Sequence, residues 1–140
     1  MQVLDTNVIS EIMKALPSHR VMEWWSQQQP DELFVTTVTV AEILYGIEIL
    51  PRGKRRESLR VEAEVVFRQD FAGRILAFDE GASRELPAIA AGRRVQGRPI
   101  AGFDAQIAAI AHSRGAILAT RNTGDFEGCG VRLVNPWAGA

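Results

Sequence analysis

Residues 1–11 read MQVLDTNVISE, and this stretch establishes the pattern of the whole chain. Gln2, Val3 and Leu4 predict a short buried strand. The apolar residues after it recur at helical spacing: Val8, Ile9, Ile12 and Met13. A strand that passes directly into a helix is typical of α/β folds. Asp5 stands at the junction, where a carboxylate can cap a helix or hold a ligand.

The rest of the chain repeats this alternation of strand and helix. Short apolar runs predict further strands at residues 33–36, 75–78, 116–119 and 131–134. Helical patterns fall between them, at residues 18–25, 40–47, 57–71, 82–91 and 104–115, and residues 92–102, rich in Gly, Pro and Arg, predict a loop. The expected fold is therefore a three-layer α/β/α sandwich with a parallel β-sheet.

Composition limits the classes of protein to consider. The 140 residues are 46% hydrophobic and 24% charged with a net charge of −1, which fits a single globular domain over residues 1–140. No apolar stretch reaches the roughly 20 residues that span a bilayer, and no leader pattern opens the chain, so we expect a cytoplasmic protein. Cys129 is the only cysteine, which excludes a disulfide framework and a cysteine-rich metal site.

Acidic residues follow the predicted strands at the edge where α/β proteins place their sites. Asp5 follows the first strand, Glu42 lies one turn into the helix after the second, and Asp125 follows the fourth, while Asp104 begins a helix of its own. Clustered carboxylates repel each other unless a cation is bound, and oxygen ligands suit Mg²⁺ or Mn²⁺. A metal site is one interpretation of this pattern.

Each acid also has a purely structural interpretation. Asp5 and Asp104 are placed to act as helix N-caps. Thr39 and Glu42 have the spacing of a capping box. Asp125 follows Thr-Gly and is suited to a turn. Spacing alone leaves both interpretations open.

Five blocks of sequence, in order, resemble PIN-domain ribonucleases, the toxins of VapBC-type modules, and within that family the FitB and plasmid-stability branch. The blocks are LDTNVISE from Leu4, TVAEILYGIE from Thr39, FDAQIAAIA from Phe103, ATRNTGDFEG from Ala119 and the closing LVNPW. The resemblance implies a PIN-like α/β/α fold and a Mg²⁺-dependent, or Mn²⁺-dependent, endoribonuclease. It also implies a cognate antitoxin that inhibits the enzyme, and assembly as a homodimer or a toxin–antitoxin hetero-oligomer.

The resemblance assigns roles to individual residues. Asp5, Glu42 and Asp104 match the acidic metal-binding positions, and Asp125 matches the aspartate of the DF pair. The chain has Asn122 where many relatives have Asp, which leaves the fourth ligand and a second metal open. The remaining matches are polar residues of the catalytic site: Asn7, which orients it, and Thr120, which closes the end of the fourth strand.

Arginines near the acids are candidates for RNA binding. Arg93, Arg94 and Arg98 lie in the expected loop before Asp104, and Arg121 follows Thr120. The alternative is a solvated surface loop without a ligand.

Two other functions compete with the nuclease. A phosphoacceptor signalling domain, with Asp79 after the third strand, requires a second acid beside Asp5 and a late lysine, and the chain has neither. A catalytically silent PIN-like module that binds nucleic acid or protein remains the alternative, and the retained acids disfavour it.

Overall fold

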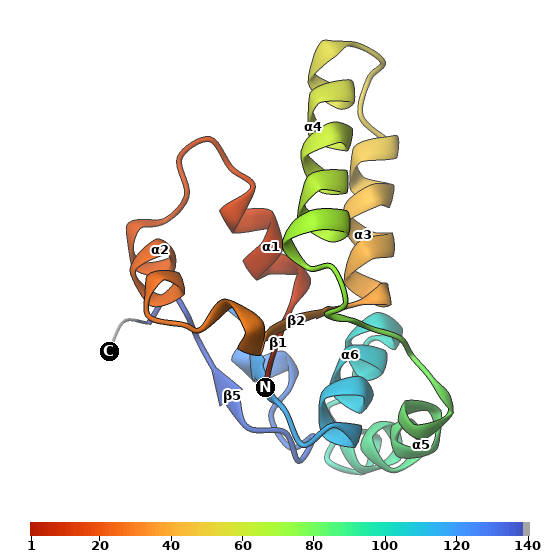
Figure 1. Cartoon of the computed structure of the whole chain (residues 1–140). Helices are drawn as coiled ribbons and strands as arrows, with labels where there is room; N and C mark the ends of the chain where they lie inside the picture. Colours follow the sequence, from red (N-terminus) through yellow and green to blue (C-terminus); the bar gives the residue numbers. More distant parts are fainter. Residues whose placement is uncertain (139–140) are drawn as a thin grey trace.

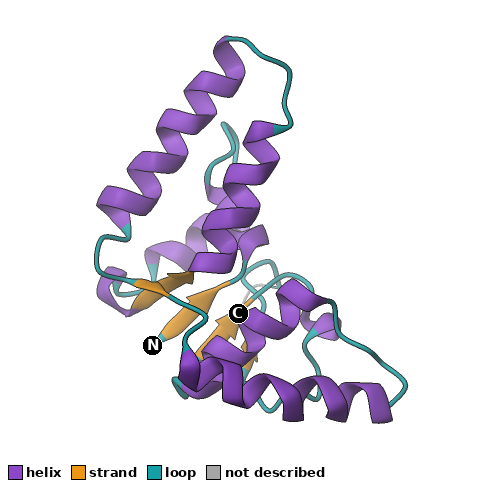
Figure 2. Cartoon of the chain, turned by 90° about the vertical axis from the view of Figure 1, so that its right-hand side faces the viewer, coloured by secondary structure: helices purple, strands orange, loops and turns teal. Residues whose placement is uncertain are grey.

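Five parallel strands form the centre of the molecule in a computed structural model that describes residues 1–138. Their spatial order is β3-β2-β1-β4-β5, and every neighbouring pair is parallel, as expected. The strands are short: β1 (Gln2–Leu4), β2 (Leu33–Thr36), β3 (Ile75–Leu76), β4 (Ile117–Ala119) and β5 (Leu133–Val134). Figure 2 shows them side by side between the helices.

Helices cover both faces of this sheet, which confirms the three-layer α/β/α fold. One face packs against α5 (Glu80–Val95) and α6 (Gly102–Ser113). The other carries α1 (Thr6–Ile12), α2 (His19–Ser26), α3 (Thr37–Glu48) and α4 (Lys54–Val65). In Figure 1 α5 and α6 lie together at the lower right, away from α1 and α2.

The alternation of side chains along a strand explains the two cores. Val3 and Leu118 pack with α5 and α6, whereas their chain neighbours Leu4 and Ala119 pack with the helices of the opposite face. All four side chains are fully buried. Because both faces of β1 and β4 are covered, the buried residues of these strands, including Val3, Leu4 and Leu118, are apolar.

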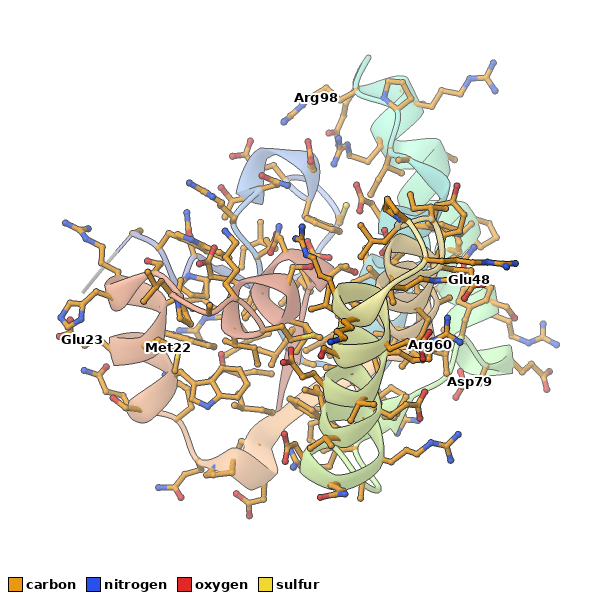
Figure 3. All side chains as sticks on the ribbon, turned by 90° about the horizontal axis from the view of Figure 1, so that it is seen from above. Met22, Glu23, Glu48, Arg60, Asp79 and Arg98 are labelled. Carbon is orange, nitrogen blue, oxygen red and sulfur yellow. The ribbon has the colours of Figure 1, made fainter. Side chains whose placement is uncertain are left out.

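Helices α3 and α4 form an antiparallel pair that projects beyond the sheet (Figures 1 and 2). Glu48 at the end of α3 accepts hydrogen bonds from Arg56 at 2.5 Å and Arg60 at 2.9 Å, both on α4. Figure 3 shows Glu48 and Arg60 together on this pair. The predicted long helix after residue 57 is therefore α4, which continues into one π-helical turn (Val66–Asp70).

Several element bounds differ from the sequence-based expectation. Strands β3 and β5 are each two residues shorter than the predicted strands at 75–78 and 131–134. The expected loop at 92–102 begins later, because α5 continues through Arg93 and Arg94 to Val95. The buried Arg93 side chain anchors this last turn to the segment after β4. Within residues 1–138 no helix is long and apolar enough to cross a membrane.

Candidate active site

Asp5 lies where β1 ends, and its carboxylate is held on both oxygens. Oδ1 accepts the backbone N–H of Thr6 at 2.8 Å, so the predicted N-cap of α1 is present. Oδ2 accepts the hydroxyl of Thr120 at 2.8 Å and the amide of Asn7 at 3.4 Å. The strand, the cap and the Thr120 hydroxyl thus fix one carboxylate at the carboxyl edge of the sheet.

Glu42 faces this site from α3. Its Oε1 accepts the hydroxyl of Thr6 at 2.8 Å, and the same hydroxyl lies 2.9 Å from Oγ1 of Thr39. The capping-box interpretation of Thr39 and Glu42 is wrong, because the N-cap of α3 is Thr36, whose hydroxyl accepts the N–H of Thr39 at 3.1 Å. Glu42 therefore does not cap α3. Its hydrogen bond from the Thr6 hydroxyl connects it to the residue that follows Asp5.

Asp104 and Asp125 approach from the other face of the sheet. Helix α6 begins at Gly102 with Ala101 as its N-cap, so Asp104 lies in the first turn rather than at the cap predicted as its structural role. Asp125 ends a short 3₁₀ turn (Thr123–Asp125) after β4, which agrees with its interpretation as a turn residue.

The acids lie close enough together for their charges to raise the pKa of Asp5 and of Asp104. Burial raises the pKa of Asp5 more than its hydrogen bonds lower it, and the charges of Glu42 and Asp125 add to the increase. Burial, together with the charges of Asp5, Asp125 and Glu42, raises the pKa of Asp104 from 3.8 to about 6. Clustered carboxylates repel one another unless a cation is bound, and perturbed pKa values of this kind indicate a candidate functional site.

A cleft of about 400 Å³ opens between these elements. Asp5, Glu42 and Asp104 line it together with Asn7 and Asn122. Asp125 acts on it through its charge and does not line it. At the Thr120 end, the hydroxyl of Thr120 also accepts the N–H of Asn122 at 3.1 Å, which places the predicted polar residues around a single hydroxyl.

The arginines predicted to bind RNA occupy different environments. Arg121 lines the cleft. Arg98 is exposed, pairs with Glu127 at 3.3 Å and lies at the outer edge of the molecule in Figure 3. Arg94 is exposed on the last turn of α5.

Arg93 does not fit the predicted role. Its side chain is 4% exposed, and its guanidinium donates to the carbonyls of Arg98 at 2.7 Å, Asp125 at 2.5 Å and Glu127 at 3.1 Å. These bonds occupy Nε and Nη1 inside the protein, and the side chain is buried, so the structure disfavours a contact between Arg93 and RNA phosphates. Arg93 instead holds the backbone of Asp125 in place.

Five cleft residues were missed by the sequence analysis: Thr6, Ser10, Glu11, Lys14 and Trp137. Ser10 and Glu11 follow Asn7 by three and four residues on α1, so helical periodicity could have placed them on the Asn7 face. Lys14 lies beyond this helix, which ends at Ile12. The hydrogen bond from Thr6 to Glu42 and the position of Trp137 in the cleft depend on tertiary structure, so no local sequence pattern predicts them.

The donor set fits a divalent cation in an open site. Within residues 1–138 no three acidic, histidine or cysteine side chains are arranged as a ready metal cage. Mg²⁺ keeps several waters and binds proteins through one or two carboxylates, so a loose acidic cleft suits it better than a closed cage. Fold and site together define a parallel α/β protein with an acidic cleft at the carboxyl edge of its sheet.

Comparison with known proteins identifies the family. The PIN domain family matches residues 3–128. The plasmid stability protein StbB of Pseudomonas syringae pv. tomato is 42% identical over 98% of this chain and 99% of its own length. The VapC ribonuclease Y4jK of Sinorhizobium fredii is 42% identical over 98% of both chains. The toxin FitB of Neisseria gonorrhoeae is 37% identical over 98% of this chain and 99% of its own.

Solved structures agree with this assignment. FitAB bound to an IR36 DNA fragment matches with a TM-score of 0.92 and 37% identity, over 98% of this chain and 96% of that chain. The chain therefore belongs to the PIN domain family, as its sequence blocks indicated.

Proposed function

We propose that this protein is a metal-dependent endoribonuclease and the toxin of a toxin–antitoxin pair that acts in the cytoplasm. The observation that carries the proposal is the set of three carboxylates, Asp5, Glu42 and Asp104, that line one cleft together with Arg121. The charge of Asp125 acts on Asp5 and Asp104 from outside the cleft. The names of its relatives, a VapC ribonuclease and the toxin FitB, support the same activity.

Asp5, Glu42 and Asp104 would hold Mg²⁺ or Mn²⁺, with Asp125 or Asn122 completing the site. When bound, the ion supplies positive charge for a phosphodiester and lowers the pKa of a water molecule that attacks it. Fewer anionic ligands stand at the Asn122 side, so a second ion would be held there less tightly.

The chain's own residues prepare this site. Thr120 and Asn7 hold Oδ2 of Asp5, and Thr6 holds Oε1 of Glu42, so the acids are oriented before a ligand arrives. The raised pKa of Asp104 keeps its carboxyl partly protonated near pH 6. Deprotonation must accompany binding of a cation, which makes the site dependent on pH.

A second groove fits the antitoxin. This groove, of about 1120 Å³, runs between α1, α3 and α4 and is lined by apolar residues including Ile12, Ile43 and Leu59. Thr6, Ser10, Lys14 and Glu42 line both the groove and the acidic cleft. An apolar antitoxin segment in the groove could therefore extend a basic side chain to the acids. We expect this complex to form a hetero-oligomer, and the free protein a homodimer.

The experiment is cleavage of RNA by the purified protein with Mg²⁺. We expect cleavage that stops with a chelator and in Asp5→Asn, whereas the matched variant Asp31→Asn, which changes an exposed acid outside the cleft, cleaves like wild type. RNA binding without cleavage by the folded wild type would favour the silent module instead. Cleavage that persists in folded Asp5→Asn would contradict the assigned site.

A further inference from the structure

The acidic cleft also has a basic wall. Arg121 and Lys14 line the same cleft as Asp5, Glu42 and Asp104. The ammonium of Lys14 is paired with Glu11 at 3.0 Å, and the other Glu11 oxygen accepts the N–H of Ser18 at 2.9 Å. The charge of Lys14 is thus largely compensated within the protein. The basic wall therefore depends mainly on Arg121.

Arg121 forms no ion pair with any carboxylate of residues 1–138. Its guanidinium carbon lies 5.3 Å from the ring centroid of Trp137, and its backbone N–H donates to Oδ1 of Asn7 at 3.3 Å. Its positive charge lowers the pKa of Glu11 after the larger effects of Lys14 and Ser18. Arg121 stacks on the Trp137 ring and does not pair with the acids of the cleft. The planar donors of its guanidinium therefore stay available for a ligand.

Trp137 is held independently of Arg121. It is half-buried and packs on the core of the α1 face. Its backbone N–H donates to Oδ1 of Asn135 at 2.9 Å. The ring is therefore a fixed platform, and the stacked guanidinium loses less conformational freedom when it binds an anion.

We propose that Arg121 binds a phosphate of the RNA strand across the cleft from the acids, and that Trp137 is the positioning residue that fixes its guanidinium there. The proposal rests on the proposed nuclease function and adds the substrate contact on the non-metal side. One wall would take the cation and the other a phosphate, so a single strand would be fixed at two points. Nothing in the sequence distinguished Trp137 from a core tryptophan.

The test measures binding of a short single-stranded oligoribonucleotide of mixed sequence across a range of salt concentrations. The parent is Asp104→Asn, which is expected to bind without cleaving. Each phosphate contact that is lost lowers the slope of log affinity against log salt by about 0.7 for a single strand. We expect Arg121→Ala to lower the slope by about this amount and the affinity several-fold. In the Asp104→Asn background Arg84→Ala is the control, because it removes an exposed arginine outside the cleft that pairs with Glu80.

Substitutions of Trp137 separate positioning from packing. Trp137→Leu keeps apolar volume against the core and removes the aromatic face, so we expect about 3-fold weaker binding and a salt slope between those of the parent and Arg121→Ala. Trp137→Phe keeps the face and should restore parent binding. In the cleaving wild type, Arg121→Ala should raise KM more than it lowers kcat.

A salt slope unchanged in folded Arg121→Ala, or Trp137→Leu binding like Trp137→Phe, would overturn the subsite. If wild type still cleaves RNA in that case, the proposed function stands and only the subsite fails. If the parent binds no RNA even at low salt, the subsite is wrong, and wild-type cleavage then decides whether the nuclease function fails with it.

Discussion

Replacing Asp104 by Asn should stabilise the metal-free protein, because the wild-type carboxyl group is held where its charge is unfavourable. Burial and three neighbouring acids raise its pKa from 3.8 to about 6. A pKa difference of this size corresponds to about 3 kcal/mol in the free energy of unfolding for a fully buried group. Because Asp104 is partly exposed, solvent screening reduces this cost to about 1–2 kcal/mol. The first turn of α6 favours a negative charge by about 0.5 kcal/mol, which the variant loses. The net expected gain in the free energy of unfolding is about 1 kcal/mol.

The sign of the pH dependence follows from the same shift. Between about pH 4 and pH 6 the folded protein binds more protons at Asp104 than the unfolded chain, so wild-type stability decreases as pH rises through that window. The advantage of Asp104→Asn should be complete above this window and absent below it. Urea unfolding at several pH values, with chelator present, measures it, and at neutral pH the gain corresponds to a rise of about 3 °C in Tm.

Magnesium should reverse the order of stability of wild type and Asp104→Asn. Millimolar Mg²⁺ should raise the Tm of wild type by mass action and have little effect on Asp104→Asn. The exposed-acid variant Asp31→Asn serves as the control and should unfold like wild type within about 0.5 kcal/mol. The reasoning is refuted if metal-free Asp104→Asn is no more stable than wild type at neutral pH, or if its advantage is the same at pH 4.

Three further predictions concern the same structure. Thr120→Val removes the hydroxyl that donates to Asp5 at 2.8 Å, so the pKa of Asp5 should rise further and the pH profile of cleavage should move to higher pH; an unchanged profile would show that the bond does not tune Asp5. Arg93→Ala leaves buried carbonyls unpaired and should cost about 2–4 kcal/mol in urea unfolding, with Arg93→Lys intermediate; near-wild-type stability of Arg93→Ala would contradict the anchoring role of this side chain. Thr36→Ala removes the cap of α3 and should cost about 1 kcal/mol by the same measurement; a loss no larger than that of the exposed variant Asp31→Asn would place the cap elsewhere.

The parallel sheet was predictable because short apolar runs between helical patterns are determined by local sequence. The covering of both faces followed from the same alternation, since Val3 and Leu4 must both be buried. Element ends were harder to predict: α5 extends past Gly92 because Arg93 finds buried partners far along the chain, in the segment after β4.

The acids themselves were visible in the sequence, but their local roles were not. Thr36 and Thr39 are both threonines near a helix start, and only the strand pairing of β2 decides which of them caps α3. Asp5 acts both as a cap and as a member of the acidic cluster, so the two interpretations of this residue do not exclude each other. The link from Thr6 to Glu42 joins α1 to α3 and has no counterpart in local spacing.

The central claim is that Asp5, Glu42 and Asp104 hold a divalent cation. Crystals soaked in Mn²⁺ and measured for anomalous scattering test it most directly. The account predicts an anomalous peak in the cleft between these carboxylates in wild type, and none there in Asp5→Asn crystals treated in the same way. A cleft without a peak in wild type, or a peak only at a different site, would contradict it.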